Sequence, residues 1–370
     1  MAIMMAHEDG RRLRVAIVGC GSHAYRSVLP CFDYLAAECV AFCDADVGRA
    51  RKYAAHFGAP TKDSAFDSLQ ELIKARVADA VILCVGPKQH PDLACQALEA
   101  GLHVWMEKPP AEDVAGVTRM IAARDANNRF VAVGFKKAFM PAARKMRETL
   151  NSGDFGKLRT IAARFPLGIP CDGAEVLAEK RNNNWLGNGV HPLSFLIHFA
   201  GRAESVTTHL SPLGGGFVVI QFESGVTACL HDAHGQSSSG ALERYELVCE
   251  HGHMVCDNNV KLTLHRPGAP FDYGRGFDFT AGTNETAAIT YELQHTLSTL
   301  YNKAIFVQGF VQELDHFVSA CLNAIPPTVG TLEEARYVME CYEAALLSQG
   351  QSVRIAALLE LQRQNQEKHT

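Results

Sequence analysis

The sequence predicts an α/β protein in which a doubly wound parallel sheet precedes an α+β domain with a large, mostly antiparallel open sheet. Between Leu13 and Gly134, apolar strand-type runs alternate with helix-type segments, which is typical of a parallel sheet with crossover helices. After Pro141, longer segments alternate apolar with polar residues, as do antiparallel strands that bury one face. A sheet of this size has a face left to cover, so we expect a homodimer or homotetramer built through it.

Length and composition limit the number of domains, the binding partners and the cellular compartment that we expect. The chain of 370 residues suits an N-terminal arm over 1–12, a first domain over 13–134 and a second over 135–370 for substrate binding and oligomerisation. A formal net charge of −5 provides no basic field for nucleic acid or anionic lipid. The sequence shows no signal-peptide core and no apolar stretch of membrane-spanning length. Twelve cysteines without a C-x-x-C pair favour reduced thiols, so a cytoplasmic protein without nucleic-acid or membrane partners is expected.

A glycine-rich turn, Gly-Cys-Gly-Ser-His-Ala over 19–24, follows the first strand-type run. Gly19 allows a tight bend, and Gly21 lets backbone N–H groups approach a pyrophosphate. A small residue at Ala24 lets the next helix pack closely against the strand. These features predict a dinucleotide-binding Rossmann domain. The turn would supply cofactor contacts from Gly19, Gly21, Ser22, His23 and Ala24.

A second apolar run, 39–43, ends at Asp44, about 20 residues past the turn, where a carboxylate accepts from a ribose hydroxyl. A carboxylate at this position favours the free 2′-hydroxyl of NAD and repels the 2′-phosphate of NADP. Arg49 and Arg51 follow on the next helix and partly offset that preference. NAD is therefore the expected cofactor, with NADP the lesser alternative.

Helix and strand signals place the remaining elements. In the first domain, helices are expected over 25–35, 47–57, 68–75, 91–100 and 114–127, and strands over 14–18, 39–43, 80–85, 102–106 and 130–133. In the second domain, strands are expected over 158–165, 203–209, 216–222, 226–231, 245–250 and 260–265, and helices up to Leu150, over 305–323 and over 332–349.

With these residues in view, the chain resembles the Gfo/Idh/MocA family, which includes inositol dehydrogenase and glucose–fructose oxidoreductase. The resemblance covers 14 to about 355 and rests on the glycine turn, Asp44 and further motifs. Those motifs are Val85-Gly86-Pro87-Lys88-Gln89-His90, His103-Val104-Trp105-Met106-Glu107-Lys108-Pro109, the segment 134–141 and Gly189-Val190-His191. The resemblance implies an NAD(P)-dependent dehydrogenase or reductase acting on CH–OH groups. It also implies cofactor contacts from Val85, Gly86, Pro87, His90, Glu107 and Lys108.

Lys108 is the first candidate catalytic residue. It follows a strand whose carboxyl end points at the crevice where doubly wound sheets bind ligands. A cationic amine there stabilises the oxygen of an alcohol as negative charge builds, which is the role that the resemblance implies. Glu107 is expected to pair with Lys108 or to bind a ribose, and a cis bond before Pro109 would aim the lysine. An ordinary surface lysine is the alternative.

His191 is the second candidate, and it begins a predicted helix. Its imidazole, with an ordinary pKa of about 6.5, takes and returns a proton at neutral pH. The resemblance makes it the general acid and base, while a helix-start histidine satisfied by the backbone is the alternative. The family commonly has carboxylates four residues before and three residues after this histidine, where the present chain has Gly187 and Ser194.

Three explanations of the missing carboxylates remain open. Asn188, Asn184 or Asp172 substitutes for one of them, the substrate needs fewer hydroxyl contacts, or the protein binds its ligands without turnover. Amides suit sugar hydroxyls, and Trp185 suits stacking on a sugar ring or, equally, a place in the core. The expected substrate-binding residues are Lys108, Lys136, Asn184, Trp185, Asn188 and His191. The histidines near 231 and 251 lack partners at a recognised spacing, so no metal is expected.

The sequence thus predicts an NAD(H)-dependent oxidoreductase that transfers hydride between a nicotinamide and a secondary alcohol or ketone of a sugar, inositol or related polyol. One alternative is a non-redox lyase or glycosidase that transiently reduces a tightly bound NAD. The other is a catalytically silent regulator that binds NAD and a sugar. Gly187 favours both alternatives, whereas retention of Lys108 and His191 argues against the regulator.

Overall fold

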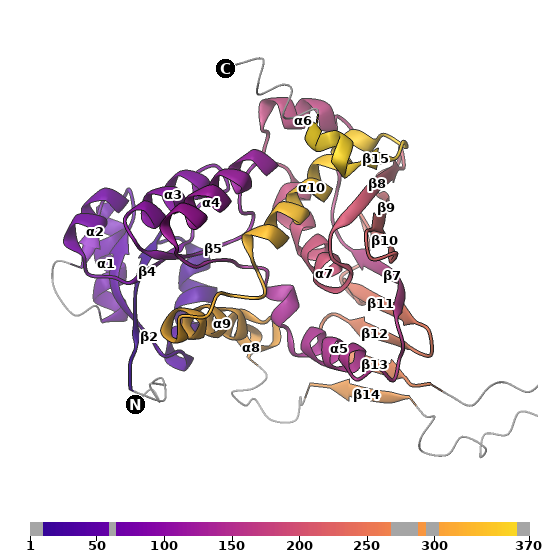
Figure 1. The fold of residues 1–370 in the computed structure, drawn as a ribbon, viewed down its shortest axis with the longest axis horizontal. Coiled ribbons are helices and arrows are strands. Elements are labelled where there is room, and N and C mark those ends of the chain that lie inside the picture. The colour runs from indigo at the N-terminus through magenta and orange to yellow at the C-terminus, as the bar shows by residue number, and fades with distance from the viewer. Residues whose placement is uncertain (1–9, 59–63, 268–287, 294–302, 361–370) are drawn as a thin grey trace, which may run out of the picture. The chain divides into compact units, whose positions relative to one another are not determined.

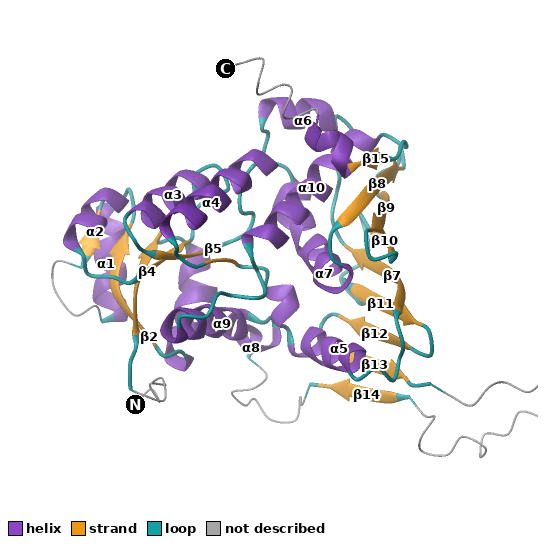
Figure 2. Cartoon of the chain, viewed as in Figure 1, coloured by secondary structure: helices purple, strands orange, loops and turns teal. Residues whose placement is uncertain are grey.

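A computed structural model of the chain describes residues 10–58, 64–267, 288–293 and 303–360. The chain divides into two compact units, each with its own sheet (Figures 1 and 2). The first unit combines Met1–Phe139 with Ala304–Met339, and the second combines Met140–Lys303 with Glu340–Thr370. The predicted division at residue 134 differs from this arrangement, because a late segment of the chain returns to the first unit.

Among the described residues, the first unit contains a six-stranded sheet in the order β3-β2-β1-β4-β5-β6, and all of its strand pairs are parallel. The strand order reverses between β1 and β4, so the predicted doubly wound sheet is confirmed. Ligands of such sheets bind at this switch point, beyond the carboxyl ends of the strands. The strands are β1 Leu13–Val18, β2 Ala37–Cys43, β3 Ala65–Phe66, β4 Ala80–Leu83, β5 His103–Met106 and β6 Val131–Val133.

Local sequence explains the helices of the first unit. Helix α1, Val47–Phe57, begins where the Asp46 side chain accepts a hydrogen bond from the Arg49 backbone, and it ends at Gly58 with a φ of 71°. The helix predicted over 25–35 is instead two irregular turns, η1 Ala24–Val28 and η2 Leu29–Tyr34, because the proline at position 30 has no N–H to continue a regular helix. The others are α2 Leu69–Ala75, α3 His90–Glu99, α4 Val114–Asn127, η3 Lys136–Phe139, α8 Ala304–Val307 and α9 Phe310–Asn323.

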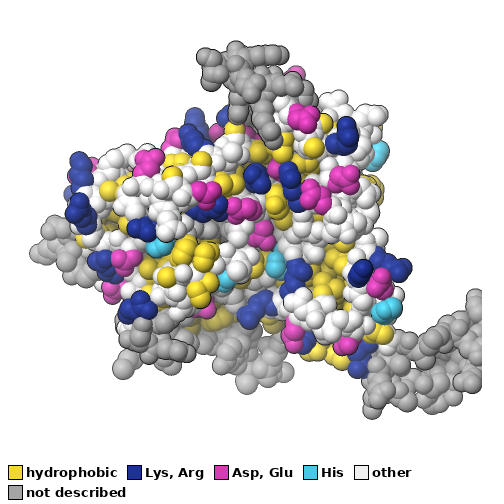
Figure 3. Space-filling view, in the orientation of Figure 1, with side chains coloured by type: hydrophobic (Ala, Val, Ile, Leu, Met, Phe, Trp, Pro, Cys, Tyr) yellow, Lys and Arg dark blue, Asp and Glu magenta, His cyan; other side chains and the backbone are white. Residues whose placement is uncertain are grey.

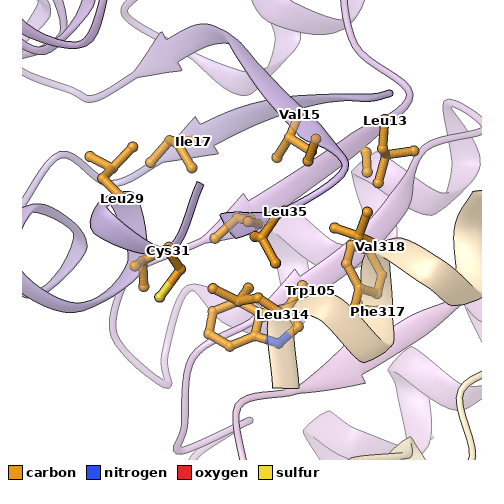
Figure 4. Packing of buried hydrophobic residues seen from close by; sticks show 14 of the residues in the cluster. Leu13, Val15, Ile17, Leu29, Cys31, Leu35, Trp105, Leu314, Phe317 and Val318 are labelled. Atoms are coloured by element: carbon orange, nitrogen blue, oxygen red, sulfur yellow. The ribbon is translucent and has the colours of Figure 1, made fainter. Parts of the chain in front are cut away.

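Helix α9 belongs to the core of the first unit. Val15 and Ile17 of β1 point to one face of the sheet, where they share a buried cluster with Leu314 and Phe317 of α9 and with Trp105 (Figure 4). A parallel sheet is stable when both of its faces are covered. The irregular turns after β1 cover only part of this face, and α9 covers the rest.

The second unit contains, in the described part of the chain, a nine-stranded sheet in the order β14-β13-β12-β11-β7-β10-β9-β8-β15. Its pairs are antiparallel except for β10 with β7, which confirms the predicted mostly antiparallel sheet. Strand β12, His253–Asp257, is not among the strands named from the sequence. The other strands are β7 Leu158–Phe165, β8 Ala203–Leu210, β9 Gly216–Phe222, β10 Thr227–Asp232, β11 Arg244–Cys249, β13 Lys261–His265, β14 Ile289–Glu292 and β15 Val353–Arg354.

The two faces of this sheet differ in burial. On one face, Val218, Leu230 and Leu247 are fully buried. On the other face, Phe217 and Val248 are exposed. The helices of the unit are α5 Pro141–Asn151, α6 Gly173–Glu179, η4 Trp185–Gly189, α7 Val190–Ala200 and the later part of α10 Leu332–Ser348.

Surface charge and helix character agree with the composition. Basic and acidic side chains are intermixed on the face drawn in Figure 3. Within the residues placed by the structure, no helix combines the length and apolar character needed to cross a bilayer.

The packing of α9 generates a stability prediction. Leu314 is fully buried between the helix and the sheet, so Leu314→Ala should leave a cavity and lower the free energy of unfolding by about 2–5 kcal/mol. Urea unfolding followed by circular dichroism measures this change. The control is Ile325→Ala, at a side chain that is 61% exposed, which should change stability by less than about 0.5 kcal/mol. Equal effects of the two variants would contradict the place of α9 in the core.

Candidate cofactor and catalytic site

The glycine turn has the geometry that a dinucleotide requires. Gly19 has a φ of 94°, and a Cβ at this residue would overlap the backbone carbonyl of Cys84, so only glycine fits. A Cβ at Gly21 would meet nothing within 4 Å, which leaves the backbone open to a close ligand. Ala24 is fully buried against the sheet. The turn therefore fits a pyrophosphate, which backbone N–H groups and the following helical turn would hold.

Asp44 fastens the glycine turn to the end of β2. Its Oδ2 accepts from the backbone N–H of Cys20 at 2.8 Å, and its Oδ1 accepts from Asp46 N–H at 2.9 Å. The Arg49 guanidinium lies 3.5 Å from the same Oδ2 and is half exposed. The carboxylate predicted for the ribose thus also organises the turn, and an arginine stands beside it.

Glu107 connects the glycine turn with the end of β5. Its Oε1 lies 2.7 Å from Nε2 of His23, and its Oε2 accepts from the backbone N–H of Lys108 at 3.1 Å. The contact with His23 was not expected, whereas Lys108 was one of the two partners that the sequence suggested for Glu107 and makes its contact through the backbone N–H. The Lys108–Pro109 bond is cis, as predicted. Burial lowers the pKa of Lys108, and the neighbouring Glu107 opposes this shift.

His90 supports the turn at Lys108–Pro109, and its buried position corrects its prediction as a cofactor contact. The side chain is fully buried, and its Nδ1–H donates to the carbonyl of Pro109 at 2.8 Å. Burial also lowers the pKa of His90, which favours the neutral imidazole. The predicted neighbours Val85, Gly86 and Pro87 are partly exposed directly after β4, and Ser22 is exposed and accepts from Arg26.

Lys136 lies in the first unit in a setting that the sequence did not reveal. Its Nζ donates to Oε1 of Gln308 at 2.6 Å and lies 4.3 Å from the ring centre of Phe310. Burial lowers the pKa of Lys136 to about 8, with the Lys137 ammonium adding to the shift and Glu313 opposing it. Gln308, Phe310 and Glu313 all belong to the returning segment.

His191 lies in the second unit, near the start of α7. Its side chain is buried, with its ring centre 6.5 Å from that of Phe165. The hydroxyl of Ser194, which stands where the family commonly has a carboxylate, donates to the His191 carbonyl at 2.8 Å. The other such position, Gly187, has open space around it, since a Cβ there would meet nothing within 4 Å.

Trp185 is a core residue, so of the two places that the sequence allowed, the core is correct and the platform for a sugar ring, with Trp185 as a substrate-binding residue, is not. Its side chain is fully buried, and Nε1–H donates to the carbonyl of Tyr342 at 3.2 Å. The indole lies directly against Gly189, where a Cβ would overlap the ring. The glycine of the Gly-x-His motif is therefore required by the packing of this tryptophan.

The residues considered as substitutes for the missing carboxylates have separate roles. Oδ1 of Asn184 accepts from Gly168 N–H at 2.9 Å, and Asp172 pairs with Arg181. Asn188 is exposed. The structure thus engages Asn184 and Asp172 in local contacts of the second unit. In the described part of the chain, no three His, Cys, Asp or Glu side chains are arranged to hold a metal ion.

Comparison with known proteins agrees with this geometry. The family model "Oxidoreductase family, NAD-binding Rossmann fold" matches residues 13–135, and that of the "GFO/IDH/MocA C-terminal domain" matches residues 143–255. An inositol 2-dehydrogenase of Saccharopolyspora erythraea is 30% identical over 275 residues, 70% of this chain and 78% of that protein. A dTDP-3,4-didehydro-2,6-dideoxy-alpha-D-glucose 3-reductase of Saccharopolyspora spinosa is 28% identical over 254 residues, 66% and 74% of the two chains.

Solved structures show the same fold. An oxidoreductase from Agrobacterium radiobacter, in complex with NAD+, L-tartaric acid and magnesium, has a TM-score of 0.76 at 16% identity, covering 94% of this chain and 99% of that one. A 3-ketoreductase from Actinomadura kijaniata, in complex with TDP-benzene and NADP, has a TM-score of 0.65 at 19% identity, covering 92% and 99%. The glycine turn and the two sheets define an oxidoreductase with an NAD-binding Rossmann fold. The chain belongs to the Gfo/Idh/MocA family, as its motifs predicted.

Two glycines of η4 provide a matched test of the packing around Trp185. Gly189→Ala should destabilise the second unit by about 1–3 kcal/mol, because the new methyl group meets the indole ring. Gly187→Ala should leave stability unchanged or raise it by up to about 1 kcal/mol, because the methyl group enters open space in a helix. Thermal unfolding of both variants checks the contrast. A reversed order would show that Trp185 does not pack as described.

Proposed function

We propose that the protein is an NAD(H)-dependent oxidoreductase that transfers hydride between a nicotinamide and a secondary alcohol or ketone of a sugar, inositol or related polyol. One observation carries this proposal. Lys108 follows the carboxyl end of β5, and Glu107 ties its backbone to the His23 ring of the glycine turn. A cation held at this edge of a doubly wound sheet is suited to a reacting oxygen next to a cofactor on the same turn.

The residues would divide the chemistry between them. The bound cofactor supplies the hydride acceptor or donor. The Lys108 ammonium stabilises the substrate oxygen while negative charge develops on it. His191 takes the hydroxyl proton during oxidation and returns it during reduction. Lys136 and the exposed Asn188 are proposed to contact substrate hydroxyls, and Asn184 contributes through its amide nitrogen.

We propose NAD as the preferred cofactor. Asp44 accepts from two backbone N–H groups and stays ready to accept from a ribose hydroxyl, while its negative charge opposes a 2′-phosphate. Arg49 beside the carboxylate weakens this discrimination, so the preference should be moderate. Relatives of this fold are bound to NAD+ in one structure and to NADP in another.

A different function is favoured by one observation. Gly187 and Ser194 supply no carboxylate next to His191, because the space beside Gly187 is open and the Ser194 hydroxyl donates to the His191 carbonyl instead. A lyase or glycosidase that cycles a bound NAD, or a regulator that binds NAD and a sugar, would need fewer such groups. Both alternatives predict NAD binding without release of NADH.

The decisive measurement is the absorbance of NADH when the protein meets NAD and a panel of sugars, inositols and uronic acids. We expect turnover with NAD exceeding that with NADP. Lys108→Ala should lower kcat/KM by about 10²–10³-fold and His191→Asn by about 10²–10⁴-fold, with NAD affinity retained in calorimetry. The control is Lys74→Ala, an exposed lysine of α2, which should keep full activity. Full turnover by the Lys108 variant would refute the site assignment.

We also propose that the protein forms a homodimer or homotetramer in the cytoplasm. The exposed face of the nine-stranded sheet, with Phe217 on β9 and Val248 on β11, supplies apolar surface for a second copy. Val248→Glu should shift the protein to a smaller species in sedimentation velocity, because a charge would be buried at the contact. Leu213→Glu, in an exposed loop, is the control. An unchanged sedimentation coefficient in the Val248 variant would exclude this face.

A further inference from the structure

Glu313 is a buried carboxyl group in the first turn of α9 that the proposed reaction does not use. Its side chain is 2% exposed, and among the residues that the structure places, neither Oε1 nor Oε2 has a hydrogen-bond partner. Burial of a polar group without partners costs free energy, so such a residue in a core of apolar side chains calls for an explanation.

The charges around Glu313 come from several elements. Glu107 approaches from the end of β5, Lys136 from η3 and the Cys31 thiol from η2. Burial raises the pKa of Glu313 well above the usual range of a carboxyl, Glu107 raises it further, and Lys136 lowers it. Burial and the neighbouring Glu107 therefore favour the protonated, neutral form of Glu313, and Lys136 opposes them.

The same group of side chains reaches the glycine turn. The Lys136 amine lies over the ring of Phe310, one helical turn before Glu313. The ring centre of His23 lies 5.8 Å from that of Phe310, and His23 contacts Glu107 at 2.7 Å. Glu313 thus lies one helical turn from the Phe310 ring, which lies against both Lys136 and His23 of the glycine turn, within the first unit.

The nicotinamide ring carries a positive charge when oxidised and none when reduced. A cation brought close to a buried acid favours its ionised form, and this effect is strong where water is excluded. We infer that Glu313 is a positioning residue that holds a proton in the cofactor-free protein and releases it when oxidised cofactor binds, so that its carboxylate then faces Lys136 and the nicotinamide cation. The inference rests on the proposed cofactor and requires no turnover.

Proton linkage predicts the direction in which NAD+ affinity changes with pH. If binding of NAD+ releases a proton from Glu313, a rise in pH favours binding, by up to about tenfold in affinity per pH unit for one full proton. NADH and ADP-ribose share the adenosine and pyrophosphate groups of NAD+ but lack the cationic ring. They should bind without this release, and any proton exchange caused by the shared adenosine and pyrophosphate groups cancels when the ligands are compared.

The experiment is isothermal titration calorimetry of the full chain with NAD+, NADH and ADP-ribose, in buffers of different ionisation enthalpy and at several pH values. Wild-type protein should release up to one more proton with NAD+ than with ADP-ribose. Glu313→Gln, whose amide has the shape of the protonated acid, should abolish the difference. It should also flatten the pH dependence of NAD+ affinity while leaving ADP-ribose affinity within about twofold.

A second variant separates Glu313 from its neighbour. Lys136→Arg keeps a cation that does not lose its proton, so the NAD+-specific release should persist if Glu313 is the source. Release that survives in Glu313→Gln, or that disappears in Lys136→Arg, would overturn the inference. Failure of the wild-type protein to bind both NAD+ and ADP-ribose would instead refute the cofactor assignment and, with it, the inference.

Discussion

The parallel sheet of the first unit must be covered on both faces, and the rest of the structure depends on this requirement. After β1 the chain forms only η1 and η2, whose short irregular turns leave apolar side chains of the strand without a partner. The missing surface is supplied by α9, which begins almost three hundred residues after β1 ends. The cofactor unit is therefore discontinuous in sequence because its core requires it.

This cover also brings chemistry to the crevice. The segment that places Leu314 and Phe317 in the core also carries Gln308, Phe310 and Glu313 to the neighbourhood of Lys136 and Glu107. The segment that stabilises the sheet through its apolar side chains thus also affects the pKa of Lys136, through Glu313. Stability and the electrostatics of the site share one element.

Local signals were sufficient for much of the fold. Helix α1 runs between the predicted bounds because Asp46 and Gly58 are strong start and stop signals. The glycine turn is also a local signal, because the residues that form it are adjacent in sequence. Long-range packing was beyond such signals. The periodicity of α9 shows an amphipathic helix but not the sheet on which it packs, and Trp185 reads equally well as a stacking platform or a core residue.

The site shows the same limit. Lys108 was identifiable because it follows a strand within a recognisable motif, whereas the fully buried place of His90 depends on a contact with Pro109, nineteen positions further along the chain. Glu313 gave no signal, since one glutamate on a helix face is commonplace. Its burial and its neighbours exist only after the chain has returned to the first unit.

Because α9 lies late in the sequence, it is synthesised long after the sheet that it covers. A ribosome produces the strands of the Rossmann sheet first, but the helix that seals one of its faces emerges only after most of the second unit has been made. Until then Val15, Ile17 and Trp105 lack their packing partners on α9, so the nascent first unit exposes apolar surface that favours aggregation. A chain that stops before position 324 therefore lacks part of the helix that completes the core of the first unit.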